Sequence, residues 1–183
     1  MTILHIDSSI SGDDSVSRTI SGAILDRLVR ENPAAVTVRR DLVDQPLAHL
    51  TFDAFVDTSV LDEFLDADTV VIGAPMYNFT LPSQLKAWLD RILIAGKTFR
   101  YTESGPEGLA RGKRVIVALA RGGIYDAGTP AAALEHLESY LRGVFNFIGI
   151  EPEFVAADGL AIGPEQKEAS VQAALGETVR LAA

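Results

Sequence analysis

Cysteine is absent from this chain of 183 residues. Without a thiol, the protein can form no disulfide, no Cys-ligated zinc site and no iron-sulfur cluster, and it has no cysteine nucleophile. The secreted class of small disulfide scaffolds is therefore excluded, and a reducing cytoplasm suits the chain.

Positive charge is also scarce, because 16 Lys and Arg stand against 25 Asp and Glu for a formal net charge of -9. This balance disfavours electrostatic binding to nucleic acid or to an anionic membrane surface. Long apolar runs are lacking as well: residues 70–74 and 115–120 fall far short of the roughly 18 residues that a membrane helix requires. Residues 1–7 contain no basic leader segment. We therefore expect a cytoplasmic protein whose partners include neither nucleic acid nor a membrane.

Short β-branched runs alternate along the chain with segments of helical period. The runs predict strands at 2–7, 36–41, 69–74, 114–120 and 151–158. Helices are expected at 17–30, 53–66, 83–94, 129–147 and 164–181, and residues 97–113 are expected to be loop-rich. Such alternation is typical of an α/β fold, here a doubly wound five-stranded parallel sheet of flavodoxin-like order with helices on both faces. We expect a single domain over residues 1–183.

Ligands of such sheets bind beyond the carboxyl ends of the strands, near the point where the strand order reverses. The first loop at this edge follows Asp7 and contains Ser9, Ser15 and Ser17 before a predicted helix. Free N–H groups at a helix N-terminus and serine hydroxyls suit a phosphate monoester. A plain helix cap by Ser15 or Ser17 is the alternative. Arg18 is either a phosphate counter-ion or a solvated surface charge.

The loops after the third and fourth strands also carry candidate ligand-binding residues. The first of them runs Met76-Tyr77-Asn78-Phe79, which offers a flat polarizable surface and one amide for a planar heterocycle. An ordinary apolar turn is the alternative. The second runs Arg121-Gly122-Gly123, where backbone amides can approach the edge of a flavin. Taken alone, this loop is better interpreted as a plain Gly-Gly turn.

Together the three loops resemble the flavodoxin-like, FMN-dependent NADH:quinone oxidoreductases known as azoreductases. The resemblance extends over nearly the whole chain through further motifs, at 84–86, 98–103, 105–109 and 147–150. The chain departs from the family pattern at Ala120, where the family usually has Ser, and in the segment 42–68, which is shorter by about a helix.

The resemblance implies one FMN as cofactor, NADH or NADPH as electron donor, and quinones or azo compounds as acceptors in a two-electron ping-pong cycle. It assigns the cofactor to Ser9, Ser15, Val16 (through its backbone), Ser17, Met76, Tyr77, Asn78, Phe79, Arg121, Gly122 and Gly123. It also implies a homodimer with active sites at the interface and a substrate pocket formed by Tyr101, Phe147 and Tyr125. FMN would carry the chemistry, so no catalytic side chain and no metal are expected.

Two other functions share this fold. A flavodoxin-type FMN electron carrier is also acidic, but it needs no substrate pocket of its own. A receiver-type signalling module needs clustered acids at the strand ends, whereas the third strand ends here in Ala74-Pro75. The enzyme is therefore favoured, with the carrier as the alternative.

Overall fold

The computed structural model describes residues 1–181 and every side chain among them except that of Phe55. The predicted domain extends to residue 183, and residues 182 and 183 lie outside the described range. Of the helices in residues 1–181, none combines the length and the apolarity that crossing a membrane requires.

The centre of the molecule is a parallel sheet of five strands in the order β2-β1-β3-β6-β7. The strands are β1 (Thr2–Asp7), β2 (Val36–Asp41), β3 (Thr69–Pro75), β6 (Arg114–Ala120) and β7 (Glu153–Ala157). All seven residues of β3 are buried, as expected of a central strand covered on both faces. The predicted doubly wound sheet is confirmed.

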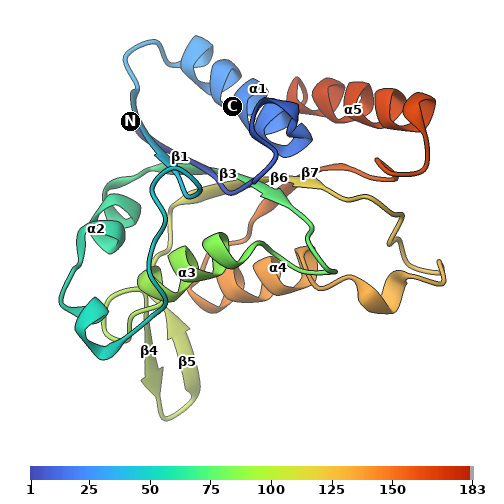
Figure 1. Ribbon diagram of the computed structural model, residues 1–183. Helices are drawn as coiled ribbons and strands as arrows, with labels where there is room; N and C mark the ends of the chain where they lie inside the picture. Colours follow the sequence, from blue (N-terminus) through green and yellow to red (C-terminus); the bar gives the residue numbers. More distant parts are fainter. Residues whose placement is uncertain (182–183) are drawn as a thin grey trace.

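Helices cover both faces of this sheet (Figure 1). One face carries α1 (Val16–Glu31) and α5 (Pro164–Thr178), and the other carries α2 (Ser59–Asp66), α3 (Ser83–Ile92) and α4 (Glu138–Phe147). Ile20 and Ile24 of α1 pack on Val71 and Ile116 in the first layer. Trp88 belongs to the core of the second layer. The sheet is therefore packed between two apolar layers, and this packing fixes the position of the carboxyl ends of its strands.

The segment predicted as loop at 97–113 contains an antiparallel hairpin, so that prediction was wrong. Its strands are β4 (Phe99–Thr102) and β5 (Gly105–Gly108). The sequence Gly-Pro-Glu-Gly has little intrinsic preference for a strand, and pairing with β4 makes it one. A Cβ on Gly108 would lie 2.2 Å from the backbone nitrogen of Gly149, so the hairpin packs on the end of α4 only because this residue is glycine.

The start of α4 also differs from prediction. Thr129 caps no helix, because its hydroxyl donates to the carbonyl of Asp126 at 2.9 Å. A 3-10 turn at Ala132–Leu134 follows, and α4 begins only at Glu138. The carboxylate of Glu135 caps it by accepting the N–H groups of Leu137 (3.0 Å), Glu138 (2.7 Å) and Ser139 (2.9 Å).

Candidate active site

The loop between β1 and α1 gathers its serines below the surface. Ser9, Ser15 and Ser17 are buried, and the Oγ atoms of Ser15 and Ser17 are 3.1 Å apart. Ser15 is the N-cap of α1, with its Oγ accepting the N–H of Arg18 at 3.3 Å. Among residues 1–181, the backbone N–H groups of Val16 and Ser17 have no acceptor. Ser15 therefore caps α1 while these two N–H groups remain available as donors at the positive end of the α1 dipole.

Arg18 is not a solvated surface charge, because its guanidinium is paired within the chain and its side chain is only 21% exposed. Its two terminal nitrogens bind the carboxylate of Asp41 at the end of β2, and Nη2 also donates to the carbonyl of Ser9 at 2.8 Å. The hydrogen bonds from Arg18 lower the pKa of Asp41 below its usual value despite partial burial. Arg18 thus fastens the serine loop to the sheet.

The loop after β3 makes a two-residue turn with unusual backbone. Asn78 (φ 47°) and Phe79 (φ 73°) are the non-glycine residues with positive φ in the described chain. The flanking residues Tyr77 and Thr80 exchange backbone hydrogen bonds of 2.9 and 3.1 Å, which is the arrangement of a type I′ turn. Positive φ costs a phenylalanine free energy, and strain of this kind gathers at functional sites.

Two contacts fix this turn to the segment before α4. The backbone N–H of His136 donates to the carbonyl of Phe79 at 3.0 Å. In return, the hydroxyl of Thr80 donates to the carbonyl of His136 at 3.1 Å. No residue pattern could indicate this role of His136, because its backbone makes both hydrogen bonds.

Tyr77 joins the second loop to the first. Its hydroxyl accepts the N–H of Ile10 at 3.1 Å and lies 3.2 Å from the Oγ of Ser9. A cavity of about 610 Å³ opens here, lined by Ile10, Met76, Tyr77, Asn78, Thr80, Leu81, Pro82, Ser83 and Gln84. Its size is that of a small-molecule site.

The loop after β6 presents glycine amides to the same edge. The carbonyls of Gly122 and Gly123 accept the N–H groups of Ala161 (3.0 Å) and Gly159 (2.9 Å). Their own N–H groups have no acceptor in the part of the chain that the structure describes. The Tyr125 ring lies 3.2 Å from the position that a Cβ on Gly123 would take. Both amides can therefore donate to a ligand.

The side chain of Arg121 is directed to carboxylates. Nε and Nη2 bind Asp158 at 2.5 and 2.8 Å, and Nη1 lies 3.3 Å from Glu138 and 3.6 Å from Glu135. Arg121 is 5% exposed and lines a cavity of about 350 Å³ together with Tyr125. The sequence offered no pattern linking Asp158 or Glu135 to this loop.

The predicted pocket residues Tyr101 and Phe147 lie elsewhere. Both pack around Phe99, with ring centroids 5.6 Å (Tyr101) and 4.7 Å (Phe147) from it. Tyr101 lies in β4, which follows α3 in the chain, and Phe147 is the last residue of α4. The hairpin of β4 and β5 lies at the opposite end of these helices from the carboxyl edge of the sheet (Figure 1). One chain does not bring them to its own three loops.

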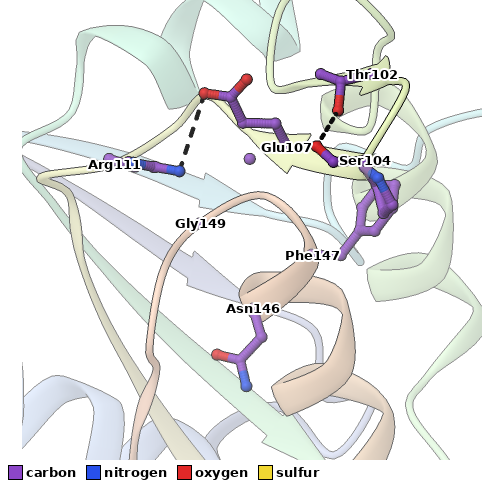
Figure 2. A pocket seen from close by; sticks show the side chains of 9 residues that line it. Thr102, Ser104, Glu107, Arg111, Asn146, Phe147 and Gly149 are labelled. Carbon is purple, nitrogen blue, oxygen red and sulfur yellow. Dashed lines mark hydrogen bonds and ion pairs between the residues drawn. The ribbon is translucent and has the colours of Figure 1, made fainter.

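A second cavity, of about 580 Å³, opens beside Phe147 at the base of the hairpin. Figure 2 shows its polar lining, in which Glu107 faces Arg111 at 4.0 Å and Thr102 bonds Ser104 at 3.0 Å. Tyr101, at the hairpin, is 75% exposed. The exposed ring of Tyr101 and this polar cavity therefore lie at the hairpin, far from the carboxyl edge of the same chain's sheet.

The side chain of His5 is directed into the core and not to the candidate site. His5 is buried, with Nε2 3.1 Å from the Oγ of Ser21, and burial lowers its pKa. It is thus a core histidine. Among residues 1–181 there is no cluster of His, Asp and Glu that suits a metal ion.

Comparison with known proteins identifies the family to which this chain belongs. Residues 1–181 match a family model described as "Flavodoxin-like fold". The chain is 54% identical over 201 residues to "FMN-dependent NADH:quinone oxidoreductase 2" of Bradyrhizobium diazoefficiens. It is 52% identical over 206 residues to a Sinorhizobium fredii protein named "FMN-dependent NADH:quinone oxidoreductase". In each comparison, both chains are covered completely.

Solved structures agree with this assignment. An azoreductase from Bacillus anthracis superposes with a TM-score of 0.91 at 28% identity, covering 99% of this chain and 98% of that one. An FMN-dependent NADH-azoreductase from Bacillus anthracis, in complex with FMN, gives a TM-score of 0.85 at 28% identity with both chains fully covered. The chain therefore belongs to the family of proteins with the flavodoxin-like fold that includes the relatives named FMN-dependent NADH:quinone oxidoreductase.

Proposed function

We propose that this protein is an FMN-dependent NADH:quinone oxidoreductase with azoreductase activity. Within residues 1–181, four backbone N–H groups at this edge have no acceptor: those of Val16 and Ser17 after β1, and those of Gly122 and Gly123 after β6. This observation carries the proposal. FMN is a ligand with a phosphate at one end and hydrogen-bond acceptors on its ring at the other. The names of the relatives support the enzyme over the electron carrier.

The residues present fit this cofactor. Ser9, Ser15, Ser17 and the amide of Val16 would hold the phosphate, where the dipole of α1 favours an anion. Met76, Tyr77, Asn78 and Phe79 would line the ring, and Gly122 and Gly123 would meet its pyrimidine end. When bound, FMN supplies two-electron chemistry, accepting a hydride from NADH and passing the electrons to a quinone or an azo compound.

The protein's own part is to bind, orient and exclude water. Asn78 carries one amide donor and one acceptor on a turn that hydrogen bonds from both sides hold rigid. The N–H groups of Gly122 and Gly123 would stabilise negative charge on the ring edge without moving, because their carbonyls are already bonded. A quinone takes up a proton in addition to the hydride equivalent, and water supplies that proton in this scheme, so no side chain needs to transfer it.

The proposal includes a homodimer with the sites at its interface, in the cytoplasm, where NADH is available. Tyr101 and Phe147 would be aromatic walls of the partner's substrate pocket, and Tyr125 would line the pocket of its own chain. Support comes from their positions, since Tyr101 and Phe147 lie a helix length from the chain's own loops and Tyr101 exposes 75% of its surface. A two-fold axis would let one hairpin serve the other site.

The first experiment measures FMN binding by quenching of flavin fluorescence. We expect one FMN per chain. Replacing Ser15 and Ser17 together with Ala should weaken binding by about 1 to 3 kcal/mol, the scale of hydrogen bonds to a charged group. Ser11→Ala is the matched control, since Ser11 is an exposed serine of the same loop. A wild-type protein that leaves added FMN fluorescence unchanged overturns the proposal.

The second experiment separates enzyme from carrier. Rapid mixing of the FMN-loaded protein with NADH should bleach the flavin absorbance, and a later mix with quinone should restore it. Two separable half-reactions are expected of the enzyme. If neither NADH nor NADPH reduces the bound flavin, the carrier is the correct function.

A further inference from the structure

The guanidinium, the backbone N–H and the backbone carbonyl of Arg121 all form hydrogen bonds within the chain. Its guanidinium binds Asp158 through two nitrogens and approaches Glu138 with the third. Its backbone N–H donates to the carbonyl of Ala157 at 2.9 Å, and its carbonyl accepts the N–H of Leu160 at 3.2 Å. A residue used in this way is not well placed to donate to a ligand. The next two residues, Gly122 and Gly123, have N–H groups without acceptors in the described chain.

The arginine is held firmly enough to fix its neighbours. Arg121 is 5% exposed, and its bidentate bond to Asp158 allows one orientation of the planar guanidinium. The backbone of Asp158 is itself fixed, because its N–H donates to the Oγ of Ser170 on α5 at 2.8 Å. Arg121 therefore fixes the start of the loop formed by Gly122 and Gly123, although glycine itself is conformationally free.

The same network reaches the turn at Asn78 and Phe79. Nη1 of Arg121 lies 3.6 Å from the carboxylate of Glu135, which caps α4. The next residue, His136, brackets the turn through its backbone N–H and carbonyl. The loops after β3 and β6 are thus both fastened to one short segment, residues 135–138.

We propose that Arg121 and Asp158 are positioning residues that hold the amides of Gly122 and Gly123 where they favour the reduced cofactor, and that Arg121 is not itself a flavin ligand. This inference rests on the proposed function. Reduction adds negative charge to the flavin edge, and fixed N–H donors stabilise that charge only while their direction is preserved. The phosphate and ring contacts, made by other loops, act on both redox states.

Variants of the ion pair test this with opposite changes of charge. Arg121→Gln removes a positive charge, and Asp158→Asn removes a negative one. A direct charge effect would shift the midpoint potential of bound FMN in opposite directions. Displaced amides shift it to more negative values in both variants, with reduced FMN losing about tenfold more affinity than oxidised FMN, or about 30 mV for a two-electron couple. Arg121→Lys, which keeps the charge but not the fork, should fall between wild type and Arg121→Gln.

Arg142→Gln is the matched control. Arg142 binds the same Glu138 at 2.9 Å and Glu151 at 3.0 Å, but within residues 1–181 it forms no direct hydrogen bond or ion pair with Arg121, Gly122 or Gly123. Its potential should match that of wild type. The measurements are the midpoint potential by equilibration with a reference dye and the dissociation constant of oxidised FMN by fluorescence quenching.

Each outcome decides the inference. Equal weakening of oxidised and reduced FMN, shifts of opposite sign in Arg121→Gln and Asp158→Asn, or an equal shift in Arg142→Gln overturns it while the proposed function stands. A wild-type protein that binds no FMN overturns both. If Arg121→Gln fails to fold, Asp158→Asn and Arg121→Lys still decide, because a negative shift in Asp158→Asn runs against its change of charge.

Discussion

Arg18 and Asp41 join the serine loop to the end of β2 through a bidentate ion pair. The side chains are 21% and 25% exposed, so solvent screens the pair only in part. The pair is therefore a stability determinant at the edge of the candidate site, and its strength depends on the protonation of Asp41.

Stability should fall on acidification partly through this pair. Because the pKa of Asp41 is lower in the folded than in the unfolded chain, its contribution is complete above the unfolded value and is lost as the pH falls through the folded value. Asp41→Asn should lower the free energy of unfolding by about 2 kcal/mol at neutral pH, and the deficit should shrink as the pH is lowered. Denaturant unfolding over a pH series measures this, with exposed Asp13→Asn as the control. A deficit that stays constant at every pH contradicts the prediction.

Phe79 offers a separate test of backbone strain. Its φ of 73° is natural for glycine, and its side chain is 45% exposed, so little burial is lost on truncation. Phe79→Gly should raise the free energy of unfolding by about 1 kcal/mol relative to Phe79→Ala, which keeps the strain and also lacks the ring. Thermal unfolding of the two variants without FMN checks this. Equal stability of the two would mean that the turn relaxes.

At the scale of elements, the strands were the most predictable part of the molecule. Residues 69–75 form a nearly continuous apolar run, which is typical of a parallel strand that is buried on both faces. The start of α4 was not predictable, because Thr129-Pro130 has the local pattern of a helix start while the real cap depends on a carboxylate bent back onto three N–H groups. The local sequence pattern favours Thr129 as the helix cap, whereas the fold of the chain places Glu135 at that position.

The two candidate caps can be compared directly. Burial raises the pKa of Glu135, but the N–H donors of α4 outweigh it and lower the pKa below its usual value. Glu135→Ala should therefore cost about 1 to 2 kcal/mol of stability as a lost cap, and Thr129→Ala should cost clearly less. Denaturant unfolding of both variants measures the difference. A larger loss in Thr129→Ala would place the functional cap where the sequence pattern had it.

At the scale of the whole molecule, topology made much of the candidate site predictable. The carboxyl ends of β1, β3 and β6 meet at one edge, so the serine, aromatic and glycine loops had to converge. What could not be predicted from residue types is the bonding of Arg121 to Asp158 and the distance of Tyr101 from these loops, because both depend on how α4 and the hairpin pack.

The proposed dimer makes a quantitative prediction for mixed chains. Tyr101→Ala should lack an aromatic wall, and Ser15→Ala with Ser17→Ala should lack tight FMN binding, so each homodimer should turn over quinone slowly. Random mixing after mild dissociation should restore one intact site in each mixed dimer, or about a quarter of all sites. Steady-state assays before and after mixing measure this. Activity that stays at the level of the parents would mean that each site is built within one chain.

The parallel pairing of the sheet also sets the order of events during refolding. Near the carboxyl ends of the strands, Asp7 pairs with Gly73, and Gly73 with Ala118, so the edge that carries all three loops closes only after distant parts of the chain have met. Contacts of this range form slowly, whereas helices form early. When the denatured protein is diluted into buffer with FMN, the far-ultraviolet circular dichroism signal should recover before flavin fluorescence is quenched. Capture of the cofactor would then mark the end of folding, and the fluorescence of free FMN would stay unquenched around any chain that stalls before β6 joins the sheet.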